Sequence, residues 1–164
     1  MADDPLPSHS ETQSWKSLGT GGPTIHALAR LAGASWADTQ PIGVDSPHEL
    51  SAEARTILAL ARQHGVIELK STNIAFDSTE RLLTVHVQLT ENRQMRFSKT
   101  GNARFTIRFL DGFRELCGAG LVVHQLYHEF CLTTRGFDCS DQIDRNSLAE
   151  WIDAGEVIGW TDVS

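Results

Sequence analysis

The sequence contains few cysteines, few prolines and no long apolar run. Its 164 residues include three cysteines, five prolines and one tyrosine. Three cysteines cannot all pair with one another, which argues against the disulfide framework of a small secreted protein. No apolar stretch approaches the roughly 20 residues of a membrane-spanning helix, so no membrane partner is predicted. Because the chain does not begin with the basic and apolar segments of a signal peptide, we expect a cytoplasmic protein.

The chain also has no excess of positive charge. Its 14 Lys and Arg residues stand against 21 Asp and Glu residues, which gives a net charge of -7. This balance argues against a protein that acts mainly through contacts to nucleic acid. Residues 1–23 hold three of the five prolines and little apolar surface, so we expect a disordered arm there. Residues 24–164 have the length and composition of a single domain.

Helical spacing of apolar residues predicts several helices. A short one begins after Thr24 and ends at Gly33, and residues 34–45 follow as a loop. Ser46-Pro47-His48-Glu49 has the pattern of a capping box with proline at the first helical position, which predicts a helix over 47–64 that ends at Gly65. Further helices are predicted over 103–117 and 141–153.

Alternating apolar and polar residues predict strands between these helices. Residues 66–69 form the first, residues 74–76 and 81–89 form a hairpin, and residues 95–97 return beside it. A second hairpin joins 121–125 to 130–133. The economical arrangement is an α+β fold in which about three helices pack on an antiparallel sheet.

The segment 103–117 fits two patterns. Its first half alternates as a strand would, whereas Phe105, Phe109, Phe113 and Leu116 share one face of a helix. The greater length of the helical match, with Asn102 available as a cap, favours the helix. A strand over 103–110 stays open as the alternative.

Two stretches resemble known families. The predicted order over 47–153, together with the acidic charge, is similar to that of the small chaperones of type III secretion, which implies a dimer that holds an unfolded client protein in grooves. Residues 113–136 resemble the recognition helix and wing of a winged-helix domain, since Leu132-Thr133-Thr134-Arg135-Gly136 matches the Leu-Thr-x-x-Gly that often ends such a wing. This second resemblance implies DNA binding through the helix and the hairpin.

Positive charge is concentrated in the middle of the chain. Residues 93–114 hold six basic residues against Asp111 and so carry +5, which leaves -12 for the remainder. We name these residues the basic cluster: Arg93, Arg96, Lys99, Arg104, Arg108 and Arg114. Residues 98–102 within it precede a predicted helix N-terminus, a position that favours an anion. Alternatively, the cluster pairs internally, with acidic residues such as Asp138, Asp141 and Asp144.

The candidates for chemistry are few. His124, His128 and Cys131 are the nearest approach to a metal set, with Cys117 and Cys139 also available, but their spacing matches no zinc pattern. The same residues could form a thiol enzyme with a histidine base. No motif indicates a cofactor. Trp151 and Trp160 are candidate anchors at a dimer or partner interface.

These observations favour a non-catalytic adaptor, chaperone-like or regulatory domain. It would bind an acidic protein or a second copy of itself through the basic cluster. The alternative is a nucleic-acid-binding regulator that uses the winged-helix-like segment 104–136. A metal-dependent or thiol enzyme built on His124, His128 and Cys131 is the second alternative.

Overall fold

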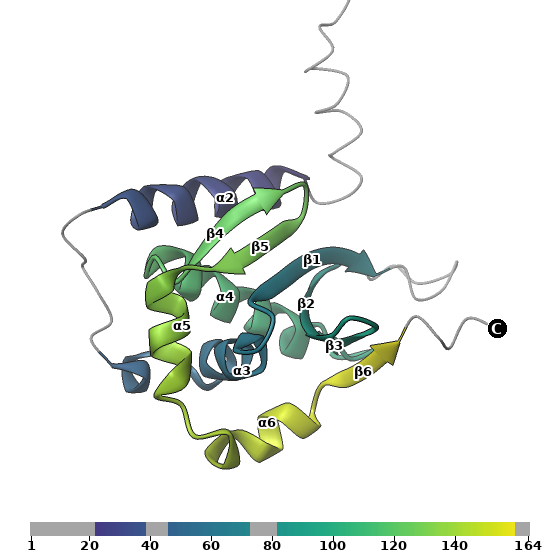
Figure 1. The fold of residues 1–164 in the computed structure, drawn as a ribbon. Helices are drawn as coiled ribbons and strands as arrows, with labels where there is room; N and C mark the ends of the chain where they lie inside the picture. Colours follow the sequence, from purple (N-terminus) through teal and green to yellow (C-terminus); the bar gives the residue numbers. More distant parts are fainter. Residues whose placement is uncertain (1–21, 39–45, 73–81, 160–164) are drawn as a thin grey trace, which may run out of the picture.

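The computed structural model describes residues 22–38, 46–72 and 82–159, which build one six-stranded antiparallel sheet (Figure 1). The strands are β1 Val66–Thr72, β2 Leu82–Thr90, β3 Arg93–Phe97, β4 Val122–Leu126, β5 Glu129–Leu132 and β6 Glu156–Gly159. Their order across the sheet is β4-β5-β1-β2-β3-β6. The β4–β5 pair therefore lies beside the β1–β2 pair, joined to it by the contact between β5 and β1, and β6 forms the edge of the sheet beyond β3.

Five α-helices and two short 3-10 helices accompany the sheet in the described part of the chain. They are α2 Gly22–Ala37, η1 Pro47–Glu49, α3 Ala52–Ala61, α4 Ala103–Gly118, α5 Thr134–Asp141, η2 Arg145–Leu148 and α6 Ala149–Asp153. The predicted α+β class is thus confirmed, with more helices than expected. None of the described helices has the length and apolar character to cross a membrane.

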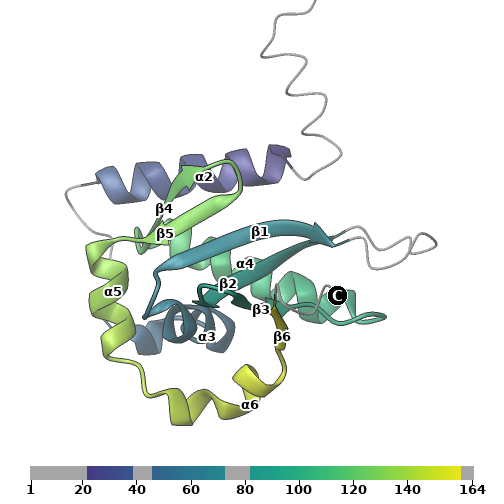
Figure 2. The same cartoon turned by 45° about the vertical axis from the view of Figure 1, so that its right-hand side comes forward.

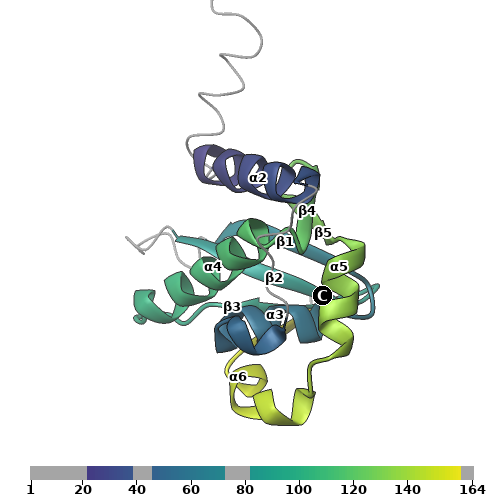
Figure 3. The same cartoon turned by 90° about the vertical axis from the view of Figure 1, so that its left-hand side faces the viewer.

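One face of the sheet meets the helices. Phe97 of β3 stacks on Phe109 of α4 with ring centroids 4.1 Å apart, and Phe113 of α4 meets Phe130 of β5 edge-on at 4.9 Å. In Figure 2, α4 runs behind β1 and β2, and Figure 3 shows α3 and α4 on the same side of the sheet. Neighbouring residues of a strand point to opposite faces, so the other face of the sheet carries a different set of side chains. We call it the polar face, and it includes Glu68, Lys70, Thr84, His86, Gln94 and Arg96.

The predicted helix over 47–64 is wrong in its first turn and at its end, since the α-helix ends at Ala61 and residues 62–64 form a turn. Ser46 accepts a hydrogen bond from the His48 backbone, but only the 3-10 helix η1 follows, and Leu50 is extended. The α-helix begins after Ser51, whose side chain caps Ala54 N at 3.2 Å. Gly65 adopts the expected left-handed conformation with φ 71°, just after the helix.

The reason lies in a contact that is distant in sequence. The carboxylate of Glu115 on α4 accepts hydrogen bonds from both the backbone and the hydroxyl of Ser51. This contact fixes Ser51, rather than Ser46, as the cap of α3. Ala54, Ile57, Leu58 and Ala61 of α3 are buried, and so is Glu53.

Two other helix predictions also fail. Helix α2 begins at Gly22, before Thr24, so residues 22 and 23 belong to the helix and not to the predicted arm. It continues through Gly33 to Ala37, because that glycine keeps a helical backbone within an alanine-rich segment, so residues 34–37 are not loop. The predicted helix over 141–153 is divided at Gln142 into the end of α5 and the later pieces η2 and α6.

Helix α5 itself was not predicted. Thr133 caps it by accepting a hydrogen bond from Gly136 N at 3.1 Å. Residues 133–136, which resemble the end of a wing, therefore begin a helix.

The remaining expectations are mostly confirmed. Residues 103–118 form a helix, which decides the ambiguity in favour of α4. The hairpin of β4 and β5 forms as expected. The strand over 66–69 extends to Thr72 and pairs with β2, and β6, which was not predicted, pairs with β3. The predicted strand 74–76, the start of the 81–89 strand and most of the predicted arm lie outside the described residues.

Candidate functional site

The basic cluster does not form a single surface. Helix α4 carries three of its arginines on the face that points away from the sheet: Arg104, Arg108 and Arg114. The helix is held firmly because Asn102 caps Phe105 N at 3.1 Å and because Phe109, Phe113 and Leu116 are fully buried beneath it. The helical repeat places the exposed residues within an arc of about 120°.

We call this exposed stripe the α4 face. It consists of Arg104, Ile107, Arg108, Asp111 and Arg114. The side chain of Ile107 is 44% exposed, which is high for a large apolar residue. Arg108 approaches Glu53 of α3, with Nε 3.7 Å from Oε1, but its side chain stays 63% exposed. The Glu53 carboxylate is largely buried, but most of the Arg108 side chain is exposed, so the remaining guanidinium donors stay available to another carboxylate.

The other members of the basic cluster lie elsewhere. Arg96 is on the polar face of the sheet, opposite α4, where it pairs with Glu156 of β6. Lys99 follows β3 and places its Nζ 4.5 Å from the centre of the Phe105 ring. Arg93 is exposed at the turn into β3. Among the described residues, no ion pair joins the cluster to Asp138, Asp141 or Asp144, and Asp141 instead approaches Arg62 at 3.7 Å.

A small cavity lies where β3 leads into α4. It measures about 540 Å³ and is lined by Arg96, Ser98, Lys99, Thr100, Ala154 and Glu156. This is the site at which the sequence predicted anion binding before a helix N-terminus. The carboxylate of Glu156 already neutralises Arg96 there, which weakens the attraction for an anion.

The polar face of the sheet holds a buried histidine. His86 is 3% exposed, and burial, with the charges of Lys70 and Arg96 nearby, lowers its pKa to about 4. Thr84 donates its hydroxyl proton to the carbonyl of Lys70, so the His86 Nε2–H donates to Thr84 Oγ1 at 2.9 Å. Nδ1 is buried without a partner in the described structure, and a proton there would have no acceptor.

Lys70 ties the neighbouring polar residues together. Its Nζ lies 2.8 Å from Glu68 Oε2 and 3.2 Å from Gln94 Oε1. Burial alone would raise the pKa of Glu68, but the hydrogen bonds from Lys70 and Gln94 lower it overall. This network is a structural feature that sequence periodicity could not reveal, because it depends on the register of three strands.

The three proposed metal or thiol residues do not come together: His124 and His128 line the pocket beside α2, whereas Cys131 is on the other face of the hairpin. His124 lies opposite Phe130, with the ring centroids 5.1 Å apart, whereas Cys131 occupies the other face of β5 and accepts from Gln125 Nε2 at 3.0 Å. His124 Nε2 is 2.7 Å from the carbonyl oxygen of Tyr127 and so donates to it. Within the described residues no group of three or more His, Cys, Asp or Glu side chains could hold a metal ion.

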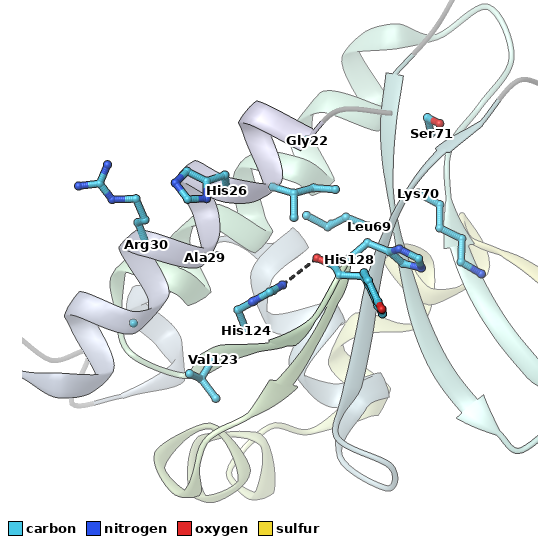
Figure 4. Close-up of a pocket in the computed structure, with 13 residues that line it drawn as sticks. Gly22, His26, Ala29, Arg30, Leu69, Lys70, Ser71, Val123, His124 and His128 are labelled. Atoms are coloured by element: carbon cyan, nitrogen blue, oxygen red, sulfur yellow. Dashed lines mark hydrogen bonds between the residues drawn. The ribbon is translucent and has the colours of Figure 1, made fainter. Parts of the chain in front are cut away.

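A larger pocket, which the sequence analysis missed, lies between α2 and the β4–β5 hairpin (Figure 4). It measures about 1040 Å³. Helix α2 contributes one wall, β1 the back and the hairpin the other wall. The lining residues include Ile25, His26, Ala29, Arg30, Leu69, His124 and Tyr127. The sequence does show that His26 and Arg30 are one helical turn apart and so share a face of a helix. It does not show that the β4–β5 hairpin lies opposite that helix, because the fold determines this.

The chain matches no protein family model, no curated protein and no solved structure. The α4 face can form charge-assisted hydrogen bonds with carboxylates around an apolar centre. The α2–hairpin pocket can enclose a small molecule.

Trp151, one of the two candidate anchors, is partly occupied within the molecule. It meets Phe109 edge-on at 6.4 Å and is half-buried. Trp160 lies outside the described residues.

Proposed function

We propose that the protein is a non-catalytic protein-binding domain whose α4 face docks an acidic protein surface. The observation that carries the proposal is the α4 face itself. It presents three exposed arginines and the exposed Ile107 on a helix whose opposite side is fixed in the core. The chain as a whole has a net charge of -7, so this face differs in sign from the average of the molecule.

The chemistry of the face suits a protein partner. Arginine presents a planar fork of donors that matches a carboxylate, and it is weakly hydrated for a cation. An exposed isoleucine between the arginines supplies apolar area that an interface would bury. Asp111 in the same stripe repels phosphate as well as carboxylate, but a folded partner can place a donor against it, whereas a nucleic-acid backbone offers only a repeated negative charge.

The proposal can be tested with a defined acidic ligand. The probe is a fluorescein-labelled 20-residue peptide of glutamate and leucine, and its binding is measured by fluorescence anisotropy. Reversal of charge on the face, in Arg104→Glu with Arg108→Glu, is expected to weaken binding at least about tenfold, because two charge-assisted contacts are replaced by repulsion.

A matched control keeps the total charge the same. Arg93→Glu with Arg145→Glu changes the net charge equally at exposed positions away from α4, and we expect binding within about twofold of the unmodified protein. Equal loss in both double variants would contradict a specific α4 face.

Nucleic acid enters the test as a competing ligand. A labelled duplex DNA of 20 base pairs should bind more weakly than the peptide at physiological salt. Tighter DNA binding that is lost in Arg104→Glu with Arg108→Glu would overturn the proposal in favour of a nucleic-acid-binding regulator.

A further inference from the structure

The α2–hairpin pocket has an unusual distribution of charge. Among the described residues that line it, every ionisable side chain except Tyr127 is a histidine, an arginine or a lysine, and none is a carboxylate. This is unexpected in a chain with 21 acidic and 14 basic residues. A cavity that excludes carboxylates within an acidic protein favours an anion over a cation.

The basic groups are not all directed into the pocket. Lys70 turns its ammonium toward Glu68, 2.8 Å away on the polar face of the sheet, and Figure 4 shows its side chain leading away from α2. His26 and Arg30 stand one turn apart on α2 at the edge of the pocket, and both are exposed; Figure 4 shows the Arg30 side chain extending from the helix away from His124. Neither has an ion pair with any other described residue.

The interior of the pocket is apolar. Ile25 and Ala29 line it from α2, and Leu69, which is 1% exposed, closes it from β1. His124 lies on the hairpin wall with Nε2 donating to the carbonyl of Tyr127. The cavity volume of about 1040 Å³ is within the upper range of pockets that enclose small organic ligands.

The rim of the pocket is strained. Tyr127 has a φ of 51°, in the left-handed region that non-glycine residues seldom occupy, and its side chain is 86% exposed. Glycine or asparagine would fit this turn at lower cost. A large aromatic side chain kept at such a position, beside a pocket, points to a contact with a ligand.

We propose that this pocket binds a small amphipathic organic anion. Its apolar body lies against Ile25, Ala29 and Leu69, its charged group meets His26 and Arg30, and Tyr127 covers it at the rim. The ligand class is an aromatic or aliphatic molecule with one carboxylate, phosphate or sulfonate group. The α4 face is not involved, so the proposal stands apart from the docking of an acidic protein.

Two fluorescent probes with the same apolar body separate the contribution of charge. The anion is 8-anilinonaphthalene-1-sulfonate, and the neutral probe is N-phenyl-1-naphthylamine, which lacks the sulfonate. We expect the anion to bind at one site per chain and more tightly than the neutral probe. Equal affinity for the two probes, or no binding of the anion, would overturn the proposal.

Substitutions of His26 and Arg30 test whether the anionic probe binds in the α2–hairpin pocket. Replacement of His26 and Arg30 by glutamine should weaken the anion about tenfold and leave the neutral probe within about twofold, since only the charged contacts are lost. His64→Gln with Arg145→Gln removes the same residue types at exposed positions elsewhere and should change neither affinity. Anion binding that is unaffected by the first pair, or equally weakened by the second, would refute the assignment.

Two further measurements guard against nonspecific binding. Tyr127→Asn should weaken the anion several-fold while the melting temperature is unchanged or higher, because the turn is relieved of strain. Dodecanoate should displace the bound probe, whereas dodecanol and inorganic phosphate should not, since each lacks one half of the ligand. Displacement by phosphate alone, or stronger displacement by the glutamate–leucine peptide than by dodecanoate, would contradict a small amphipathic ligand.

Discussion

Cys117 lies on the inner face of α4, where burial raises the pKa of its thiol to about 12. Burial also raises the pKa of Cys139, whereas Cys131 is only partly buried. Because the thiolate is the reactive form and access is required, we expect Ellman's reagent to modify one thiol rapidly in the folded protein and all three after denaturation. Cys131→Ser should abolish the rapid phase. Rapid modification of that variant would contradict the burial of the other two thiols.

His86 predicts a dependence of stability on pH. Its pKa is about 4 in the folded protein, against 6.5 for an ordinary histidine, so between these values the unfolded chain binds more protons than the folded one. The free energy of unfolding therefore falls as the pH decreases from about 6.5 to about 4, by roughly 3 kcal/mol from this residue. The lowered pKa of Glu68 acts in the same direction at still lower pH.

The contribution of His86 can be isolated by urea denaturation at a series of pH values. His86→Gln should be less stable at neutral pH, because the bond to Thr84 is altered, but its stability should fall less between about pH 6.5 and about pH 4. His64→Gln, at an exposed position, serves as the control and should keep the slope of the unmodified protein. Parallel curves for all three proteins would contradict the assignment.

At the scale of the elements, two glycines within helices predict opposite effects. A Cβ at Gly136 of α5 would collide with the carbonyl oxygen of Leu121, whereas a Cβ at Gly33 of α2 would meet nothing within 4 Å. Gly136→Ala should therefore lower the free energy of unfolding by about 3 kcal/mol, because backbone must move. Gly33→Ala should raise it by up to about 1 kcal/mol through helix propensity. Thermal or urea denaturation checks both, and equal effects would show that α5 does not pack this closely.

The contact between Gly136 and Leu121 illustrates why some elements could be predicted from the sequence and others could not. Helix α4 and the strands β2, β4 and β5 follow from local periodicity, since each has one apolar face that the core buries. Helix α5 is short and contains Gly136, which is unfavourable for a helix but required by its approach to Leu121. The start of α3 likewise depends on Glu115, which is 64 residues from Ser51. Such contacts between distant residues leave no local pattern.

The candidate sites show the same limit. The six basic residues were identifiable from composition, but the fold decides that three of them share the α4 face while Arg93, Arg96 and Lys99 lie elsewhere. The α2–hairpin pocket joins α2, β1 and β4, which are far apart in the sequence, so its residues could not be grouped in advance. Residue types can indicate that charge is concentrated, whereas the topology decides which charges act together.

At the scale of the whole molecule, charge is distributed unevenly. Residues 93–114 carry +5 within a chain of net charge -7. Each copy therefore presents both a basic face on α4 and acidic surface elsewhere. A two-fold arrangement of two copies can make the contact between them twice, which is the usual geometry of a homodimer. A second copy of the chain is thus one acidic partner that the α4 face could dock.

This possibility predicts an oligomeric state that depends on salt. Light scattering after size-exclusion chromatography should show a dimer at about 50 mM salt and a shift toward monomer at about 500 mM, because higher ionic strength screens contacts between exposed charges. Arg104→Glu with Arg108→Glu should be monomeric at both concentrations, whereas Arg93→Glu with Arg145→Glu should behave as the unmodified protein. A dimer that persists in high salt, or in the first variant, would place the interface away from the α4 face. A monomer under all conditions would leave that face to a different acidic protein, which the peptide titration then measures.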